Sequence, residues 1–229
     1  MLLVVSVIAL LIAMVLPALG QAKEAALRTT CMVSMHQLGN ALPAYTTDNA
    51  GKLPFDNWRG VETAAPTTTP AGWIYDFKVK DPMAFTAGDP LDRVLDHMKT
   101  GTFWPYVRNH ALYRCPKDPR PPWDGKLPVR QMISYPMNGA VSGYGRRGGM
   151  TFNMATFRSD AILLWEVDYS FWWDGSDHPS QGMIARHLGG GCAASADGTA
   201  EWMHVNRYDE LERQRPGRLW CVPDTAGGQ

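Results

Sequence analysis

The sequence has no excess of charge of either sign: its 229 residues include 22 lysine and arginine residues and 22 aspartate and glutamate residues. A chain with this balance has no overall charge that would draw it to nucleic acid or to an acidic surface. We therefore expect no nucleic acid among its partners. A repeat with a period of roughly 20–50 residues is also missing, which argues against a solenoid or a propeller.

The motifs of several large enzyme classes are missing as well. The chain contains no G-x-S-x-G element, Walker A loop, dinucleotide-binding fingerprint or H-E-x-x-H pair. None of its cysteines lies in a sequence context that pairs it with a histidine, as an activated thiol nucleophile would require. We therefore expect no catalytic residues, no enzymatic activity and no cofactor.

Charge is also missing from the first 19 residues, where Ser6 is the only clearly polar side chain. As a helix that rises ~1.5 Å per residue, this run would span about 28 Å, close to the thickness of the hydrocarbon core of a bilayer. One interpretation is a cleaved secretory signal that ends at Ala18-Leu19-Gly20, but such signals begin with basic residues and no lysine or arginine precedes Lys23. The other is a retained membrane helix in which Pro17 is an internal kink.

The residues that follow the apolar run have a new periodicity. Between Gln21 and about Tyr45, six residues are spaced by three or four, which puts them on one face of a helix: Leu27, Cys31, Met35, Leu38, Leu42 and Tyr45. A signal peptide would have no reason to continue in helical phase, so the pattern favours a retained helix. We predict one continuous helix from residue 2 to about residue 42, of which only the second half packs on a globular head. Pro43 and the turn at residues 48–51 are expected to end or kink this helix.

The rest of the chain is rich in residues typical of strands and turns. It contributes most of the 22 glycines, 17 prolines, nine tryptophans, eight tyrosines and seven phenylalanines of the chain, and this composition favours short strands and loops. One short helix is predicted at residues 91–98, and residues 62–71 are predicted to form an exposed loop because they offer no apolar face to bury. Five strands are predicted, each bounded by Gly, Pro, Asn or Asp: 131–135, 161–167, 182–187, 192–196 and 199–204.

His187 and Asp197, whose side chains can act as acids, bases or metal ligands, lie near the two ends of the strand predicted at 192–196. Asp197-Gly198 predicts a two-residue hairpin turn of type I′, which needs positive φ at both central residues. Across the strand at 192–196 the two side chains would be on the order of 15 Å apart at ~3.3 Å per residue, whereas general-base catalysis needs hydrogen-bond contact. We therefore interpret His187, Asp197 and Gly198 as turn residues, with Arg186 or His187 donating hydrogen bonds to loop carbonyls, and not as ligands or catalytic residues.

The segment LLVVSVIALLIAMVLPALGQAKEAALRTTCMVSMHQLG resembles the N-terminal helix of type IV prepilin-like proteins. In particular, the sequence is similar to the bacterial pseudopilin-like group named for a C-terminal His-X9-Asp-Gly motif, here His187, nine residues and Asp197-Gly198 within a wider RHxGG…ADG context. The pieces CMVSMHQLG at 31–39, LYRCPKDP at 112–119 and SYPMNG at 134–139 are also similar to that group. The resemblance thus touches both ends and the middle of the chain.

The resemblance implies an α+β fold, with a long N-terminal helix packed on a head that contains an antiparallel sheet and long loops. It divides the chain into the membrane half of the helix (residues 1–19), its amphipathic half (20–48) and the head (49–229). It also implies a non-enzymatic subunit of a type IV pilus-like filament or a type II secretion pseudopilus. Such a subunit is a single-pass protein of the bacterial inner membrane with its head in the periplasm. It assembles with like or related pilin subunits through the helix, and the filament can carry it outside the cell.

An alternative function comes from the acidic and aromatic stretch WEVDYSFWWDGSDHP at residues 165–179. Carboxylates on a loop are the ligands that Ca²⁺ prefers, and some pseudopilins use calcium to fix a C-terminal loop, so Asp174 and Asp177 are candidate ligands of a structural calcium ion. The spacing is not that of an EF-hand, and Asp-Gly-Ser-Asp also forms ordinary turns. The tryptophans equally suit a membrane-anchored or secreted module that binds a carbohydrate or a protein.

The family also has a processing site that this sequence does not contain. Its members are made with a short basic leader, which a prepilin peptidase removes before a Phe-Thr-Leu-Ile-Glu-like start. Met1 falls about where the residue after that glutamate would be. We therefore expect that the start codon lies further upstream or that the chain is truncated.

Four cysteines complete the set of candidate residues: Cys31, Cys115, Cys192 and Cys221. A head outside the cytoplasm lies where disulfides persist, and four cysteines permit three pairings. Cys31 and Cys115 lie in segments that match the family pattern, whereas Cys192 and Cys221 fall where the pattern has no cysteine. The resemblance therefore implies a Cys31–Cys115 disulfide that joins the long helix to the head, and a Cys192–Cys221 pair. The alternative is four buried thiols with no bond.

Overall fold

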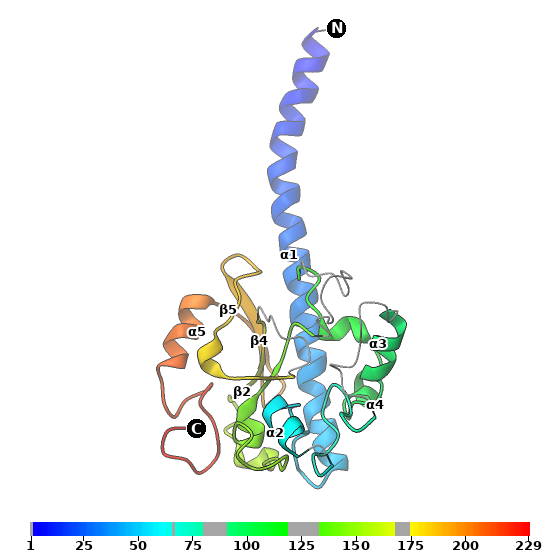
Figure 1. Ribbon diagram of the computed structural model, residues 1–229. Coiled ribbons are helices and arrows are strands. Elements are labelled where there is room, and N and C mark those ends of the chain that lie inside the picture. The colour runs from blue at the N-terminus through cyan, green and yellow to red at the C-terminus, as the bar shows by residue number, and fades with distance from the viewer. Residues whose placement is uncertain (1, 66, 80–90, 119–132, 168–174) are drawn as a thin grey trace.

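The computed structural model describes residues 2–65, 67–79, 91–118, 133–167 and 175–229. Figure 1 shows a long helix, α1 (Leu2–Asp48), whose N-terminal half projects as a stalk from an α+β head. The helices of the head are α2 (Arg59–Ala64), α3 (Leu91–Met98), α4 (Trp104–Val107) and α5 (Val205–Glu212). Its strands are β1 (Met137–Asn138), β2 (Ile162–Trp165), β3 (Ser176–Asp177), β4 (Gly190–Ser195) and β5 (Ala200–His204). The predicted α+β class and the long N-terminal helix are confirmed, and α3 coincides with the predicted short helix.

Helix α1 is continuous over 47 residues, as predicted, but it ends later than expected. Pro43 lies inside it: a proline removes one backbone donor, yet the chain continues in helical form for another turn. The Thr46 hydroxyl donates a hydrogen bond to the Pro43 carbonyl at 3.1 Å. The predicted turn at residues 48–51 then ends the helix, because Ala50 and Gly51 have positive φ and the Gly51 N–H donates to the Thr46 carbonyl at 2.8 Å.

The two halves of α1 differ in what covers them. The large apolar side chains that are exposed between Leu3 and Leu19 each show at least 50% of their surface. By length and composition, this half is apolar enough to cross a membrane. The predicted apolar face of the second half is buried in the head, with four residues at 0% exposure: Cys31, Met35, Leu38 and Leu42. Packing against the head therefore holds only the second half of the helix.

The five strands form one mixed sheet in the order β3-β1-β2-β4-β5. The pairs β1–β2, β2–β4 and β4–β5 are antiparallel, whereas β1 and β3 are parallel. The predicted antiparallel sheet is therefore correct for three of the four pairs. It is wrong for β3, an edge strand of two residues whose direction no sequence periodicity could indicate.

Helix α1 packs on one face of β4 and β5, and α5 lies on the other side of the sheet. The side chains of β4 alternate between these two layers: Cys192 and Ala194 face the core of α1, and Ala193 belongs to the core of α5. All six residues of β4 are small and buried. A Cβ atom at Gly39 of α1 would lie 3.4 Å from the Ala194 Cβ. Small residues on both elements thus allow the helix to approach the sheet closely.

Three of the five predicted strands are confirmed, since residues 161–167, 192–196 and 199–204 contain or overlap β2, β4 and β5. The strand predicted at 182–187 is wrong, because only His187 of this segment forms a bridge, to Gly190. Of the strand predicted at 131–135, residues 131–132 lie outside the described residues and residues 133–135 are not a strand, and β1 begins at Met137 instead. Both errors fall on short segments whose backbone is fixed by contacts distant in the sequence.

The hairpin between β4 and β5 turns at Asp197-Gly198, as predicted, but the turn is not of the two-residue type I′ form. Only Gly198 of the two has positive φ, at 83°. The Gly198 N–H donates to the Ser195 carbonyl at 2.9 Å, and Asp197 Oδ1 accepts the Thr199 N–H at 2.9 Å. This longer connection needs one left-handed residue, which the glycine supplies.

Residues 62–71 do not form the fully exposed loop that their composition predicted. Glu62, in α2, is 0% exposed, and its carboxylate accepts hydrogen bonds from Asn57 Nδ2 at 2.7 Å and from the Tyr75 hydroxyl at 3.0 Å. Thr69 is buried as well. Polar side chains with hydrogen-bond partners dock this segment in the head, and an argument from apolar faces could not find them.

Candidate functional site

Four side chains that can act as ligands or nucleophiles meet inside the head, against the buried half of α1. Cys31 comes from α1, Cys115 follows the 3-10 turn His110–Tyr113, Glu166 follows β2, and His187 precedes β4. One ligand atom from each residue lies within 4.8 Å of the other three. We name these four residues the thiol–imidazole cluster.

The shortest contacts in the cluster join the two sulfur atoms to each other and to the imidazole. The Cys31 and Cys115 Sγ atoms are 3.1 Å apart, and His187 Nε2 lies 3.1 Å from the first and 3.2 Å from the second. Glu166 Oε1 lies 3.7 Å from His187 Nε2. Three of the four residues are 0% exposed and Cys115 is 3% exposed. The cluster is therefore compact and closed to solvent.

The backbone turn that follows His187 fixes the position of this residue. Leu188 and Gly189 have positive φ, 52° and 82°, as a type I′ turn requires. The His187 N–H donates to the Gly190 carbonyl at 2.9 Å, and Trp202 Nε1 donates to the His187 carbonyl at 2.8 Å. The turn type that the sequence predicted at the Asp-Gly step thus lies here, where it positions a side chain of the cluster.

Backbone and hydroxyl hydrogen bonds hold Cys115. Its N–H donates to Ser134 Oγ at 3.0 Å, and the Ser134 hydroxyl donates to Asp118 Oδ2 at 2.7 Å. The Lys117 N–H donates to Cys115 Sγ at 3.3 Å. Residues 115–118 and Ser134, which are distant in the sequence, are therefore joined directly behind the sulfur atom.

A buried guanidinium group lies beside the cluster. The side chain of Arg186 is 5% exposed and places one nitrogen 3.3 Å from Glu166 Oε1 and another 3.3 Å from Asp118 Oδ2. Arg186 thus pairs with two carboxylates that the sequence analysis did not assign to it, because a buried cation needs negative partners to offset its lost hydration. Its two carboxylate partners come from segments 20 or more residues away in the sequence.

A second carboxylate approaches the far side of the imidazole ring. Glu24 Oε1 lies 3.5 Å from His187 Nδ1, and Lys117 Nζ lies 2.7 Å from Glu24 Oε2. Among the described residues, neither Glu24 Oε1 nor His187 Nδ1 has a hydrogen-bond partner. The hydrogen bond from Lys117 lowers the pKa of Glu24 below its usual value, which outweighs the opposing effect of burial. A negative oxygen therefore faces one ring nitrogen while the two sulfur atoms face the other.

Burial and mutual contact change the pKa values of the cluster. The hydrogen bond with Cys115 favours the thiolate of Cys31, but contact with Cys192 and burial outweigh it and raise the pKa of Cys31 to about 12. Contact with Cys31, together with burial, raises the pKa of Cys115 well above its usual value. Burial lowers the pKa of His187, but Cys115 and Glu166 together raise it above its usual value. Both thiols are protonated at neutral pH in this arrangement.

Two cysteines meet a histidine in the structure, although none lies beside a histidine in a matching sequence context. His187 contacts Cys31, which is 156 residues away in the sequence, and Cys115, which is 72 residues away. The two side chains near the ends of β4 have different environments: His187 is buried in the cluster, and Asp197 is exposed in the hairpin turn. The interpretation of Asp197 and Gly198 as turn residues agrees with these contacts, whereas that of His187 as a turn residue alone is incomplete.

All four cysteines are free thiols. Cys31 and Cys115 are neighbours, as the resemblance implied, but their sulfur atoms are 3.1 Å apart, which is longer than the ~2.05 Å of a disulfide bond. Cys192 contacts the Cys31 thiol, and Cys221 Sγ lies 3.7 Å from the Asn138 amide nitrogen. The implied Cys31–Cys115 and Cys192–Cys221 disulfides are therefore not formed in this structure, which corresponds to the alternative of four buried thiols.

Of the two candidate calcium ligands, only Asp177 belongs to the described part of the chain. Asp174 lies outside the described residues. Asp177 is in β3 at 0% exposure, and its Oδ1 accepts the His178 N–H at 2.7 Å. Glu166, from the same acidic stretch, belongs to the thiol–imidazole cluster, which is the one potential metal-binding group found among the described residues. A carboxylate directly after the apolar run ILLW of β2 was the sequence feature that could have indicated this buried position.

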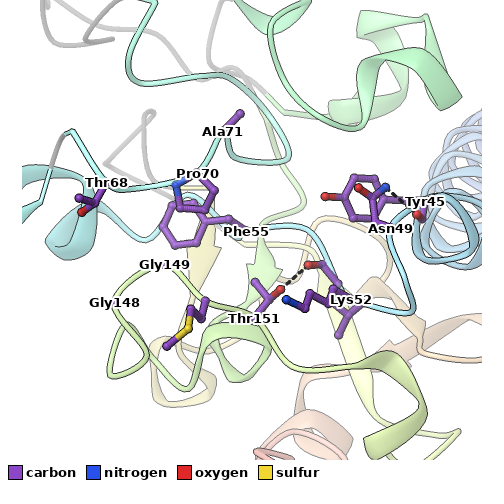
Figure 2. A pocket seen from close by; sticks show the side chains of 12 residues that line it. Tyr45, Asn49, Lys52, Phe55, Thr68, Pro70, Ala71, Gly148, Gly149 and Thr151 are labelled. Atoms are coloured by element: carbon purple, nitrogen blue, oxygen red, sulfur yellow. Dashed lines mark hydrogen bonds between the residues drawn. The ribbon is translucent and has the colours of Figure 1, made fainter.

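A surface pocket of about 360 Å³ lies near the C-terminal end of α1 (Figure 2). Figure 2 shows Tyr45 and Asn49 on one side of it and Lys52 and Thr151 below, with the Thr151 hydroxyl donating to the Leu53 carbonyl at 2.5 Å. Among the described residues that line this pocket, Lys52 is the only charged one. No carboxylate, histidine or cysteine is among the described residues that line the pocket, so these residues offer no acid–base pair of the usual kind.

The arrangement of the cluster suits bond formation or metal binding better than catalysis. A catalytic thiol must be reachable by its substrate, and both sulfur atoms lie in the protein interior. Two thiols in contact can form a disulfide, and two thiols with an imidazole and a carboxylate can hold a soft cation.

Comparisons of the chain with models of protein families, with curated proteins and with solved structures find no match.

Proposed function

We propose that this protein is a non-enzymatic subunit of a type IV pilus-like filament or of a type II secretion pseudopilus. The observation that carries the proposal is the two-part helix α1, with an exposed apolar half of membrane length and a second half packed in the head. In a subunit of this kind, the exposed half is stored in the membrane and later packs against the helices of neighbouring subunits. Both environments shield the apolar side chains from water, in which a continuous exposed apolar surface is unfavourable.

The sequence motifs support the same proposal. Three segments that are similar to the pseudopilin-like group contribute Cys31, Cys115 and His187, and these residues meet in one cluster although they are distant in the sequence. Segments that belong to one family pattern are expected to form one structural unit. In this proposal the protein is a single-pass protein of the bacterial inner membrane, with its head in the periplasm or, within a filament, outside the cell.

The assembly is testable by cross-linking through the exposed half of α1. The double variant Val7→Cys/Val15→Cys introduces two thiols at side chains that are 50% and 58% exposed. The native cysteines are all buried and are expected to stay unreactive. Oxidation of membranes and of material sheared from the cell surface is expected to give a ladder of multimers, because each subunit can then join two neighbours.

A matched control places the same chemistry on the head. The variant Val79→Cys/Met150→Cys exposes two thiols of similar accessibility, at side chains that are 63% and 65% exposed, and is expected to remain mainly monomeric. Absence of cross-linked species for the helix variant, in both membranes and sheared material, would contradict the proposal. So would a mature N-terminus beyond Gly20, since the apolar half would then be a cleaved signal.

The alternative of a binding module has less support. Trp165 of the aromatic stretch is 0% exposed, as are Trp73 and Trp220, so these three rings are part of the core. Trp172 and Trp173 of the same stretch lie outside the described residues. The pocket in Figure 2 has no tryptophan among its lining residues. A module would remain monomeric in the cross-linking experiment, which separates it from a filament subunit.

A further inference from the structure

We propose that the thiol–imidazole cluster binds one Zn²⁺ ion through Cys31 Sγ, Cys115 Sγ, His187 Nε2 and a carboxylate oxygen of Glu166. This site is independent of filament assembly, because all four ligands come from within one chain. Two thiolates, an imidazole and a carboxylate form a set of ligands that zinc binds in tetrahedral sites. Calcium prefers oxygen ligands only, so the same set does not suit it.

The distances within the cluster fit a tetrahedral zinc site. Bonds of about 2.3 Å to sulfur and about 2.0 Å to nitrogen or oxygen put neighbouring ligand atoms ~3.5 Å apart. The sulfur–sulfur and sulfur–nitrogen distances are 3.1, 3.1 and 3.2 Å, and the nitrogen–oxygen distance is 3.7 Å. The two sulfur atoms and His187 Nε2 therefore need to move by only a few tenths of an ångström, and the Glu166 oxygen lies within 4.8 Å of each of them. The full burial of the ligands indicates a closed, structural site and not a catalytic one with an open position.

The partners of the ligands provide a second, independent observation. A zinc-bound histidine usually turns its other ring nitrogen to a carboxylate, which fixes the ring and its tautomer. His187 Nδ1 faces Glu24 Oε1 at 3.5 Å, and both atoms are buried without a hydrogen bond among the described residues. A ring with its proton on Nδ1 leaves Nε2 as an acceptor directed at the two sulfur atoms. The geometry thus prepares His187 for metal binding from both sides.

The charges around the cluster also fit a bound zinc ion. Two thiolates and one carboxylate carry three negative charges, so Zn²⁺ leaves one negative charge over. The Arg186 guanidinium lies 3.3 Å from Glu166 Oε1 and can offset it. Lys117 balances the Glu24 carboxylate at 2.7 Å. Binding releases the protons of the two thiols, and no electrons are transferred.

Zinc at this position would join the helix to the head. Cys31 is on α1, whereas the other ligands lie on three separate segments of the head. The metal would therefore replace the covalent link that a Cys31–Cys115 disulfide would provide. It competes with that disulfide, since oxidation of the two thiols removes two of the four ligands.

The test uses the full-length protein, purified in detergent under reducing conditions without chelators. Metal analysis is expected to find about one zinc ion per chain, and replacement by Co²⁺ is expected to give the thiolate charge-transfer bands and intense visible bands of a tetrahedral site. X-ray absorption at the zinc edge of the wild type is expected to show two sulfur and two nitrogen or oxygen neighbours. This measurement needs no variant and remains decisive if a ligand substitution prevents folding.

Variants then assign the ligands. Cys31→Ser, Cys115→Ser and His187→Ala are each expected to lose the bound metal, and Glu166→Gln to weaken its binding. Cys221→Ala is the matched control, a buried thiol outside the cluster, and is expected to retain one zinc ion. Glu24→Gln leaves all four ligands in place and is expected to weaken zinc binding by about 10-fold, because it changes the carboxylate that faces the histidine and pairs with Lys117.

Three results would overturn the proposal. The first is a reduced wild type that takes up neither Zn²⁺ nor Co²⁺. The second is zinc retention in Cys31→Ser and Cys115→Ser at the wild-type level, which would place the metal elsewhere. The third is an absorption spectrum with no sulfur neighbour or with three, because three would bring in Cys192 and displace Glu166 from the ligand set.

Discussion

Asp56 is a carboxylic acid in the interior of the head, with 0% exposure. Its Oδ2 accepts hydrogen bonds from the Ser176 hydroxyl at 2.7 Å and the Ser142 hydroxyl at 3.0 Å. Burial raises the pKa of Asp56 from 3.8 to about 7, although these two hydroxyl groups oppose the shift, and the nearby carboxylate of Glu62 adds to it. A buried group of this kind links the stability of the head to pH.

The folded protein holds the Asp56 proton more tightly than the unfolded chain does. Stability from this group is therefore fully present below about pH 4 and decreases as the pH rises toward 7, by about 1.4 kcal/mol per pH unit. Asp56→Asn removes the titration and keeps an oxygen that can accept both hydroxyl groups. We expect the free energy of unfolding of the wild type, relative to Asp56→Asn, to fall between pH 5 and 7 and to level off above pH 7.

Denaturant titrations of both proteins at each pH measure this difference. Asp209→Asn, at an exposed position, is the control and should leave the pH dependence of the wild type unchanged. A difference between wild type and Asp56→Asn that stays constant from pH 5 to 8 would show that Asp56 does not titrate in this range.

Gly189 lies two residues after His187 and has both a left-handed backbone conformation and close contacts. Its φ is +82°, and a Cβ atom there would lie 2.8 Å from His204 Nε2. We expect Gly189→Ala to lower the free energy of unfolding by about 1–2 kcal/mol through backbone strain. Gly227→Ala, where a Cβ would meet nothing within 4 Å, should change it little. Equal stability of the two variants in thermal denaturation would contradict the strain argument.

At the scale of elements, helix α1 and strand β4 form the central contact of the head. One face of the helix buries Met35, Leu38 and Leu42, and β4 presents only small side chains to it. Close packing of this kind leaves little room for relaxation, so a shortened side chain leaves a cavity. The stability of the head should therefore depend strongly on this face and weakly on the rest of the helix.

Leu38→Ala and Val33→Ala test the two faces of α1. Leu38 is 0% exposed and Val33 is 48% exposed, although they lie on the same helix only five residues apart. We expect Leu38→Ala to cost about 2–5 kcal/mol of unfolding free energy and Val33→Ala to cost less than about 0.5 kcal/mol. Denaturant unfolding of both variants measures the contrast, and comparable losses would mean that the helix does not bury one face only.

At the scale of the whole molecule, the protein consists of a head with its own core and a helical extension that contributes nothing to that core. The described residues of the first 19 are all exposed. By length and composition, this extension is apolar enough to cross a membrane. Among the described residues, all the buried ones lie in the head or in the second half of α1.

A chain that begins at residue 20 should therefore fold into the same head and be soluble without detergent. We expect its melting temperature to lie within about 2 °C of that of the full-length protein in detergent, less than a loss of 1 kcal/mol would produce in a domain of this size. Size-exclusion chromatography and circular dichroism measure both properties. Aggregation of the shortened chain, or a clearly lower melting temperature, would show that the extension supports the head.

The parts of the fold that the sequence predicted are those with a local pattern. The apolar run and the spacing of Leu27 to Tyr45 determine α1, because a helix repeats every 3.6 residues and its faces can be assigned from the chain alone. The β4–β5 hairpin follows from two short strands around Asp197-Gly198. Strand β3 and the docking of Glu62 lack such a pattern, since a two-residue strand has no periodicity and a buried carboxylate depends on partners elsewhere in the chain.

The thiol–imidazole cluster is also a feature that no local sequence pattern could predict. The sequence supplied Cys31, Cys115 and His187 as separate members of three motifs, and it assigned Glu166 to a different loop. Cys31 and His187 are 156 residues apart in the sequence. Only the packing of α1 on β4, with the turn at Leu188-Gly189, brings their side chains within 3.1 Å of each other. Local periodicity encodes which face of an element is apolar, whereas the meeting of polar side chains from four segments depends on how those elements are arranged in three dimensions.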